Sequence, residues 1–399
     1  MRIAIIVDAY KPFHSSAAIQ IEDLANEFAA QGHDAIVITP AAEQKEAWSE
    51  DFSDGVRVLR LSAPKTKNIG RIRRAFSEIS LPFFMMWNMR KSPISTLRLD
   101  GMVWYSPTIF FGPLVYLLKK KNHCKSYLIL RDIFPDIAID LGILNKGLIY
   151  KFFKIIEDYQ YKHANTIGVQ SESNLEYLSD WAKQPQKNLE VLHNWLANRP
   201  NISSNFSISN TPLSGKTVLV YAGNMGLMQG IDIVLELADK LIARDDVGIL
   251  LVGRGSEVSR LKAEAISRGL NNIYFHDEIP PAEVPALLAQ CHIGLVLLDP
   301  RLKTHNVPGK LISYMQAGLP ILARINLGND LLDIIRVNEI GSVYVGEKTE
   351  EFLLMADILV NDALGREEMS VRCKDKAVEL FSSVVACKQI IKALEFQPD

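Results

Sequence analysis

Cysteine is scarce in this sequence, and so is any excess of charge of one sign. The 399 residues include four cysteines, Cys124, Cys291, Cys373 and Cys387, and none of them forms a C-x-x-C pair. This argues against a disulfide framework and against a structural zinc site, and it indicates a reducing compartment. Lys and Arg number 44 and Asp and Glu 46, so the net charge of −2 creates no general attraction to nucleic acid.

The chain also lacks a long uninterrupted apolar run. A membrane-spanning helix needs roughly 18 such residues, whereas residues 81–89 and 109–118 are too short or are broken by Pro and Gly. The first apolar run ends at Asp8, without the longer apolar region and small-residue cleavage site of a signal peptide. We therefore expect a cytoplasmic protein that does not span a membrane.

What is present is the composition of an ordinary globular protein. Hydrophobic residues make up 48% and charged residues 23% of the chain, which excludes a disordered or fibrous protein. Short apolar runs alternate with helical periodicity in two series, separated by a Ser-, Asn- and Pro-rich stretch at 198–214 that we interpret as a linker. This alternation predicts an α/β fold with two doubly wound, Rossmann-like domains, whose parallel sheets face each other across a cleft.

The strands expected from these runs determine where a site should lie, because ligands of doubly wound sheets bind at the carboxyl ends of the strands. The expected strands are residues 2–7, 35–39, 102–105, 127–130 and 166–169 in the first series, and 218–221, 248–252, 273–276, 293–298 and 320–323 in the second.

Two loops after strands of the second series contain glycines. In VLVYAGNMGLMQG (218–230), Gly223 and Gly226 allow the backbone to approach a phosphate at the start of a helix. LVGRGS (251–256) repeats the arrangement and adds the cation Arg254. Structural turns and a solvated arginine explain the same spacing equally well, so phosphate binding remains one of two interpretations here.

A third loop, DPRLKTHNVPGKLISYMQAG (299–318), is more informative. Pro308 suits the first turn of the following helix, and Gly309 lets the backbone come close to a ligand. A basic loop at a strand end and a helix start suits a diphosphate, although a solvated basic loop is the alternative. The potential cations are Arg301, Lys303, His305 and Lys310.

The first series offers candidates for the other side of the cleft. Arg131 and Asp132 directly follow the expected strand 127–130. Asp132 is suited to accept a hydrogen bond from a substrate hydroxyl and Arg131 to bind an anion, with a structural Arg–Asp pair as the alternative. The loop after the first strand would line the cleft on the acceptor side with His14, Ser15 and Ser16.

Several motifs occur together in one order along the chain. They are RDIFPD at 131–136, LHNW at 192–195, YAGNMG at 221–226, VGRGSE at 252–257 and VPGK with YMQAGLPILA at 307–323, after a strand–loop–helix unit that contains Asp23. In this order and spacing the sequence resembles a glycosyltransferase of family 4 over nearly its whole length. The block at 304–324 is most similar to bacterial O-antigen transferases of the N-acetyl-L-fucosamine type.

The resemblance implies a GT-B fold and retaining, metal-independent transfer without a cofactor. The sugar would come from a UDP donor and would go to a lipid-linked saccharide in O-antigen or capsule biosynthesis. It implies an acceptor-side domain at 1–196, a nucleotide-sugar domain at 215–380 and a C-terminal helix at 381–399 that returns to the first domain. The implied catalytic residues are Asp132, Arg131 and Lys310, and the implied donor-binding residues are Gly223, Asn224, Gly226, Arg254, His305, Asn306, Pro308, Gly309 and Ser313.

The sequence departs from the family pattern at three places. His305 and Ser313 stand where the family has two glutamates eight positions apart, and Ser15 and Ser16 replace the usual glycine pair. Asn224 and Gln229 stand near the places of an Arg and a Lys that neutralise the diphosphate. We therefore expect that Lys310 takes over this task.

Residues 65–91 carry seven cations and one acid, in a chain whose net charge is −2. Basic residues beside aromatic ones suit an anionic bilayer surface, and a lipid-linked acceptor favours the same interpretation. We expect peripheral attachment to the inner face of the cytoplasmic membrane; a packed helix with a solvated basic face is the alternative. The expected membrane contacts are Arg71, Arg73, Arg74, Phe83, Phe84 and Trp87.

Two other functions are compatible with this sequence. A nucleotide-sugar 2-epimerase shares the GT-B architecture, but it would release a free product and need no lipid acceptor. A non-catalytic, sugar-nucleotide-binding partner of a glycan assembly complex would explain the missing glutamate pair. Incubation with a donor and a lipid-linked acceptor separates transfer from epimerisation and from binding without turnover.

Overall fold

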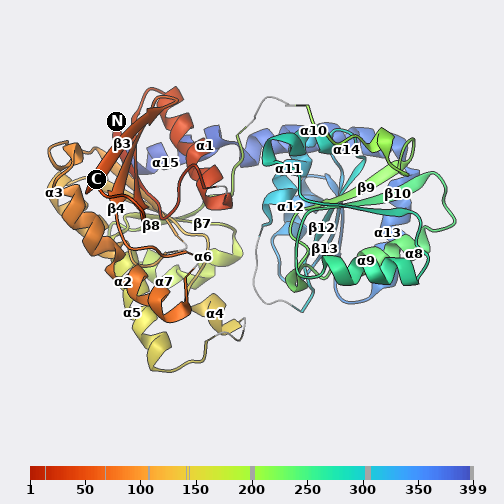
Figure 1. Cartoon of the computed structure of the whole chain (residues 1–399), viewed down its shortest axis with the longest axis horizontal. Coiled ribbons are helices and arrows are strands. Elements are labelled where there is room, and N and C mark those ends of the chain that lie inside the picture. The colour runs from red at the N-terminus through yellow and green to blue at the C-terminus, as the bar shows by residue number, and fades with distance from the viewer. Residues whose placement is uncertain are drawn as a thin grey trace. The chain divides into compact units, whose positions relative to one another are not determined.

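The computed structural model describes residues 1–13, 15–67, 69–106, 108–140, 142, 144–197, 203–301 and 307–395. The chain forms two compact units, which Figure 1 shows with their elements labelled. Unit 1 consists of Met1–Trp195 together with Ser383–Asp399, and unit 2 consists of Leu196–Ser382. The end of the chain is therefore part of the first unit.

Unit 1 contains an eight-stranded sheet in the order β3-β4-β2-β1-β5-β6-β7-β8. The edge strand β3 runs antiparallel to β4, and all the other neighbours are parallel. The strands are β1 (Arg2–Ile6), β2 (Asp34–Ala41), β3 (Trp48–Ser53), β4 (Val56–Ser62), β5 (Gly101–Tyr105), β6 (Lys125–Ile129), β7 (Thr166–Val169) and β8 (Asn188–Val191).

Helices cover both faces of this sheet. On one face, Ala4 and Ile6 of β1 pack in a core with α2 (Arg71–Met89), α3 (Gly112–Asn122) and α5 (Leu148–His163). On the other face, Ile3 and Ile5 pack with α1 (Ser16–Ala30) and α15 (Ser383–Glu395). Burial on both faces explains why β1 is a continuous apolar run rather than an alternating one. Shorter helices are η1 (Pro93–Ser95), α4 (Asp136–Asp140), α6 (Ser173–Tyr177) and α7 (Ser179–Ala182).

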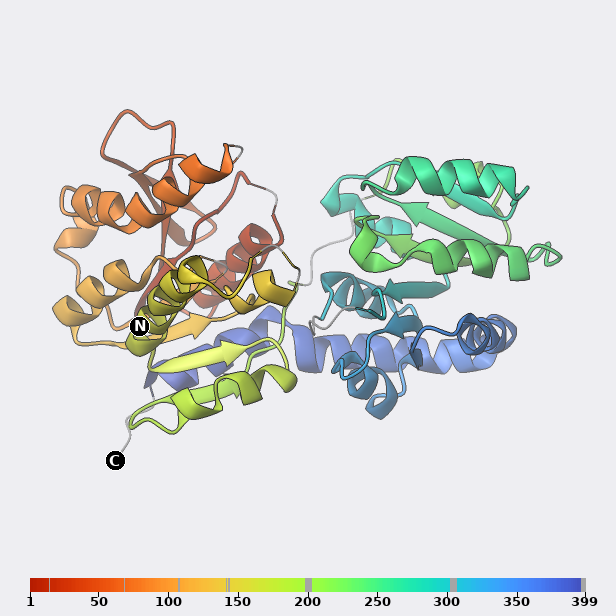
Figure 2. The same ribbon diagram turned by 90° about the horizontal axis from the view of Figure 1, so that it is seen from below.

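Unit 2 contains a six-stranded parallel sheet in the order β11-β10-β9-β12-β13-β14. Figure 2 shows its helices on both sides of the strands. The strands are β9 (Thr217–Ala222), β10 (Val247–Val252), β11 (Ile273–His276), β12 (Ile293–Leu297), β13 (Ile321–Ile325) and β14 (Gly341–Val345).

The helices of unit 2 form two layers. The helices α8 (Asp232–Lys240), α9 (Val258–Ser267) and α13 (Thr349–Asn361) pack on one face. The opposite face is covered by α10 (Val284–Leu288), α11 (Gly309–Ala317), α12 (Leu331–Val337) and α14 (Ala363–Phe381). The 3-10 turns are η2 (Ile208–Asn210), η3 (Leu227–Gln229) and η4 (Pro281–Glu283).

These sheets confirm the predicted α/β class and the parallel strand–helix alternation. Four strands of the structure were not predicted from the sequence: β3, β4, β8 and β14. Of these, β3 (WSEDFS) is too polar to show a strand pattern. The stretch at 198–214 is not a free linker where the structure describes it, because Ile208 and Leu213 are buried in the core of unit 2.

The last helix begins where α14 ends, at Ser382, whose backbone is extended. Its residues Ala386, Cys387, Ile390 and Leu394 are buried in the core of unit 1. All four cysteines of the chain are buried as free thiols. Among the helices in the described ranges, none combines the length and the apolar character needed to cross a bilayer.

Candidate active site

In unit 2, the loops that follow β9 and β10 are bonded to each other through their backbones. The N–H of Gly223 donates to the carbonyl of Val252 at 2.9 Å, and the N–H of Met225 donates to the carbonyl of Arg254 at 2.7 Å. A Cβ atom on Gly253, where φ is 141°, would lie 2.1 Å from the carbonyl oxygen of Gly223. This glycine therefore serves the contact between the two loops.

The side chains of the first loop close it internally. Asn224 donates from Nδ2 to Oε1 of Gln229 at 3.3 Å, and the N–H of Gly226 donates to the same oxygen at 3.0 Å. The N–H of Gly226, expected to contact the donor, is thus satisfied by Gln229. Gln229 stands near the place of a family cation, but here it holds the loop in shape.

Lys310 lies in the first turn of α11 and reaches the glycine loop. Its Nζ lies 3.6 Å from the centroid of the Tyr221 ring, and a Cβ on Gly223 would lie 3.8 Å from that nitrogen. No carboxylate pairs with Lys310 among the residues that the structure describes. Because the surrounding protein removes water from the ammonium group, the pKa of Lys310 falls to about 7.

The start of α11 is open beside this lysine. Pro308 is the N-cap residue rather than a residue of the first turn, and it has an extended backbone. Among the described residues, apart from its chain neighbours and the backbone of α11, no atom lies within 4 Å of the place where a Cβ on Gly309 would be, so a ligand has room to approach the backbone there. Ser313 lies one turn further along, and its hydroxyl contacts the carbonyl of Gly309 at 3.5 Å.

The other expected cations of the basic loop are Arg301, Lys303 and His305. Arg301 is paired with Asp299, whose carboxylate accepts from Nε at 2.9 Å, so it is not a free ligand for a diphosphate. His305 and Asn306 lie outside the described residues, as does Lys303. Lys310 is therefore the expected cation of this loop that the structure places beside the glycines.

A recess of about 270 Å³ adjoins the two glycine loops. Arg254 lines it, and the Nε of this residue lies 3.3 Å from Oε2 of Glu278. Apolar walls with a few polar groups are typical of sites for small molecules. Its other lining residues are Ala222, Gly223, Asn224, Val252, Gly253, Ile279, Pro281, Val284 and Leu287.

In unit 1, Asp132 lines a separate recess of about 270 Å³ at the carboxyl ends of β1 and β6. Asp8 lines the same recess and lies 3.3 Å from the ammonium of Lys67. The protein around Asp132 raises the pKa of its carboxyl group by removing water, while the charge of Arg131 acts in the opposite direction. The other lining residues are Arg74, Glu78, Thr108, Ile109, Phe110, Phe134 and Ile137.

Arg131 does not present its guanidinium to an anion. It donates from Nη1 to the carbonyl of Leu192 at 2.6 Å and from Nη2 to the carbonyl of His193 at 3.2 Å. The same group lies 5.2 Å from the centroid of the Trp195 ring. Through these contacts Arg131 joins the RDIFPD motif to the LHNW motif.

The expected acceptor-side serines belong to the start of α1. The hydroxyl oxygen of Ser15 accepts from the N–H of Ala18 at 3.2 Å, so Ser15 caps the helix. Ser16 is the first residue of α1, and its side chain lies outside the described part, as does the whole of His14.

Tyr221 contacts Lys310 but was not a candidate from the sequence. Its ring supports the ammonium of Lys310, and its hydroxyl donates to the carbonyl of Asn224 at 2.7 Å. A tyrosine at the end of a buried strand looks like a core residue, and no sequence signal distinguishes the two roles.

Residues 204–379, which lie within unit 2, match the family described as glycosyl transferases group 1. The chain is 27% identical over 230 residues to the probable glycosyltransferase WbjE of Pseudomonas aeruginosa. This alignment covers 56% of this chain and 57% of that protein. It is 24% identical over 350 residues to the putative colanic acid biosynthesis glycosyl transferase WcaI of Escherichia coli K12, covering 80% of this chain and 82% of that protein.

The fold is similar to the crystal structure of Anabaena Alr3699/HepE in complex with UDP and glucose. The TM-score is 0.65 at 15% identity, and the match covers 99% of both chains. At this identity the likeness concerns the fold. Together with the two parallel-sheet units and the match of residues 204–379 to glycosyl transferases group 1, it shows that the chain has a GT-B fold.

Proposed function

We propose that the protein is a glycosyltransferase that moves a sugar from a UDP donor to a lipid-linked glycan in the biosynthesis of O-antigen or capsule, with retention of the anomeric configuration. The observation that carries the proposal is the unpaired ammonium of Lys310 between the Tyr221 ring and the glycine loop. The similar HepE structure contains UDP, and the relative WcaI is named for colanic acid biosynthesis. N-acetyl-L-fucosamine is the donor sugar that we propose first.

In this proposal unit 2 binds the donor. The uracil ring would enter the recess lined by Ile279, Val284 and Leu287, and the diphosphate would lie at the start of α11. When the bond to the sugar breaks, negative charge grows on the leaving diphosphate. A preorganised cation and backbone N–H groups at that place stabilise the transition state more than the ground state.

Lys310 would supply the cation and Gly309 an open backbone N–H. We propose that no metal ion or other cofactor is needed, because the lysine provides the positive charge that the leaving group requires. His305, Asn306 and Ser313 would contact the sugar or the ribose in place of the family glutamates.

Unit 1 would bind the acceptor in this proposal. Asp132, in its recess beside Asp8, would accept a hydrogen bond from the acceptor hydroxyl or the sugar. Arg131 would keep Asp132 in place through its bonds to the Leu192 and His193 carbonyls.

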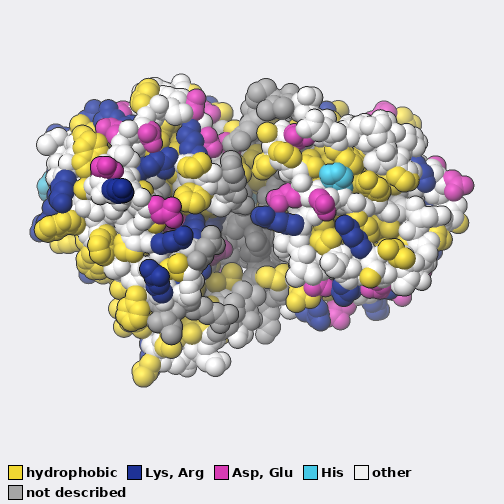
Figure 3. Space-filling view, viewed as in Figure 1, with side chains coloured by type: hydrophobic (Ala, Val, Ile, Leu, Met, Phe, Trp, Pro, Cys, Tyr) yellow, Lys and Arg dark blue, Asp and Glu magenta, His cyan; other side chains and the backbone are white. Residues whose placement is uncertain are grey.

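Two helices of unit 1 support attachment to a membrane surface. On α2, the aromatic residues Phe83, Phe84 and Trp87 are exposed. On α5, Leu148 is 86% and Ile155 69% exposed, a stripe that the sequence analysis did not identify. Figure 3 shows apolar and basic side chains next to each other over the region where Figure 1 places these helices.

The basic residues of α2 differ in how freely they could contact a membrane surface. Arg73 and Arg74 are both exposed, but Arg74 also pairs with Glu78 at 2.8 Å and lines the recess of Asp132. The side chain of Arg71 lies outside the described part. The aromatic residues are therefore the sharper probes of membrane contact, at the inner face of the cytoplasmic membrane in this proposal.

The function is tested by incubating the protein with a UDP-sugar and a lipid-linked acceptor, and analysing the products by mass spectrometry. Transfer with retention supports the proposal. Release of a free epimerised sugar nucleotide, or binding without turnover, contradicts it.

Membrane attachment is tested by sedimentation with anionic liposomes. The triple variant Phe83→Ser, Phe84→Ser and Trp87→Ser should lose most of its binding, and so should Leu148→Ser with Ile155→Ser. Phe52→Ser is the matched control, because Phe52 is also exposed but lies on the edge strand β3. Equal sedimentation of all the variants would exclude these helices as the contact.

A further inference from the structure

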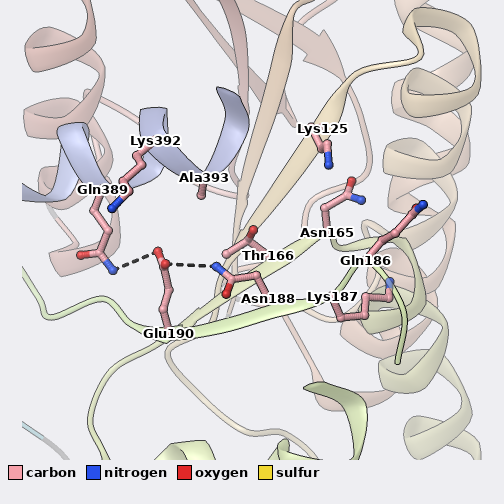
Figure 4. Close-up of a pocket in the computed structure, with 10 residues that line it drawn as sticks. All are labelled: Lys125, Asn165, Thr166, Gln186, Lys187, Asn188, Glu190, Gln389, Lys392 and Ala393. Atoms are coloured by element: carbon pink, nitrogen blue, oxygen red, sulfur yellow. Dashed lines mark hydrogen bonds between the residues drawn. The ribbon is translucent and has the colours of Figure 1, made fainter. Parts of the chain in front are cut away.

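A larger cavity of unit 1 lies away from the carboxyl ends of the strands. Its volume is about 640 Å³, and Figure 4 shows the residues that line it. Lys125, Thr166 and Asn188 are the first residues of β6, β7 and β8, and Gln389 and Lys392 come from α15. Because the strands are parallel, this cavity lies at the edge of the sheet opposite to the recess of Asp132.

The cavity carries more positive than negative charge. Three lysines line it, Lys125, Lys187 and Lys392, against one carboxylate, Glu190. Lys187 donates to the carbonyl of Lys162 at 2.8 Å, which explains its position by the end of α5. Within the described ranges, the ammonium groups of Lys125 and Lys392 have neither an acidic partner nor a hydrogen bond, so the local fold does not account for their charges.

Glu190 holds two amide side chains in fixed orientations. Gln389 donates from Nε2 to Oε1 of Glu190 at 2.9 Å, and Asn188 donates from Nδ2 to Oε2 at 3.2 Å; Figure 4 draws both bonds. The hydroxyl of Tyr127 also donates to Glu190, at 2.8 Å. The amide oxygens of Gln389 and Asn188 therefore remain as acceptors for hydroxyl groups.

The third amide, that of Asn165, offers a donor rather than an acceptor. Oδ1 of Asn165 accepts from Lys119 at 2.6 Å and from Ser126 at 3.0 Å. Its Nδ2 therefore remains as a donor on the same side of the cavity as Lys125, as Figure 4 shows. A donor beside an unpaired ammonium suits an anionic oxygen, and fixed acceptors at the other side suit hydroxyls.

We propose that this cavity is a second ligand site, which binds an anionic monosaccharide: a hexose phosphate or a uronic acid residue. The charged group lies at Lys125 and Asn165, the hydroxyls bond to Asn188 and Gln389, and Lys392 adds attraction from α15. The volume suits a ligand of that size. The site is independent of the proposed donor site, whose residues belong to unit 2.

The test is a titration of the full-length protein with sugars, in which binding is measured by calorimetry and by NMR of the ligand. Glucose 6-phosphate is the probe for a hexose phosphate, and glucuronate is the probe for a uronic acid. Glucose and inorganic phosphate are the reference compounds. We expect at least one anionic sugar to bind about tenfold or more tightly than either reference, as charge-assisted and neutral hydrogen bonds act together. UDP-glucose should not displace it.

The double variant Lys125→Met with Lys392→Met should weaken this binding about tenfold or more. Lys45→Met with Lys240→Met is the charge-matched control, because both lysines are exposed and lie away from the cavity. Thermal unfolding of the free proteins shows whether the variants fold. The proposal is overturned if neither sugar binds saturably, or if neither binds more tightly than inorganic phosphate. It is also overturned if the folded double variant keeps its affinity, or if UDP-glucose displaces the sugar.

Discussion

The ammonium of Lys310 lies over the ring of Tyr221, with Nζ 3.6 Å from the ring centroid. An aromatic face attracts a cation electrostatically without neutralising it. The arrangement therefore holds an unpaired positive charge beside Gly223 and the start of α11, where the proposed diphosphate would lie.

Replacing Lys310 by Met should lower kcat by roughly 10² to 10³, the size expected when one donor to a transition-state charge is removed. The affinity for the donor should change less. Steady-state kinetics measure both effects, and Lys240→Met, an exposed lysine of unit 2, is the control. EDTA should leave the native rate unchanged. A silent Lys310→Met variant together with loss of activity in EDTA would show that a metal neutralises the diphosphate.

The binding of a UDP-sugar should depend on pH through Lys310. Burial lowers the pKa of this lysine to about 7 in the free protein. Below pH 7 the lysine is already charged, so the affinity is highest; above pH 7, binding must take up a proton and weakens by up to about tenfold per pH unit. A UDP-sugar is a suitable probe because its diphosphate is esterified at both ends and does not titrate in this range. Calorimetry from pH 6 to pH 9 should show this decrease in affinity. If a Lys310→Met variant shows the same decrease, Lys310 is not its cause.

Changing Asp132 to Asn should lower the rate of transfer by about 10²-fold through a misplaced substrate. The change keeps the size of the side chain and removes its charge beside Asp8. The kinetic parameters for the acceptor are the measurement, and Asp158→Asn on α5, which is exposed, is the control. If both variants transfer at the native rate, Asp132 does not position the substrate.

The glycines of the β10 loop should be structural. Gly253→Ala would place a Cβ 2.1 Å from the Gly223 carbonyl at φ 141°, and it should destabilise the fold by at least about 2 kcal/mol. Gly215→Ala is the matched control. There φ is 76°, but no atom beyond the chain neighbours lies within 4 Å of the added Cβ, and a loss of about 1 kcal/mol is expected. Gly309→Ala should leave stability nearly unchanged. Urea denaturation gives the three values, and equal losses at Gly253 and Gly215 would exclude the contact between the loops as the cause.

The helix α15 should stabilise unit 1. Leu394→Ala, in a buried position of that core, should cost about 2–5 kcal/mol. Val384→Ala on the same helix should cost much less, because Val384 is 39% exposed. Deleting Ser383–Asp399 should lower the melting temperature further. Hydrogen exchange of the β1 amides reports on unit 1 separately, and unchanged exchange in the deletion variant would show that α15 adds no stability there.

The class of fold was readable from the sequence because it depends on local patterns. Apolar runs such as RIAII at β1 are continuous, since both faces of a parallel strand are covered, and the helix at α1 shows its own periodicity. Lys310 was a candidate from the sequence, because a cation at the start of a helix after a buried strand is visible in the order of residues alone, and the structure places it beside Gly223. The strand β3 was missed because its residues show no apolar alternation.

The tertiary structure decided what each of these residues contacts. Gly253 meets Gly223, Arg131 meets Leu192, and Gln389 meets Glu190, which lies 199 positions earlier in the chain. Such pairs leave no periodic signal, because either partner alone looks like an ordinary turn, charge or surface amide. The local sequence thus determined the strands, the helices and the loops that end them, whereas packing of distant segments decided which glycine approaches a backbone, which arginine is already bound and where a cavity opens.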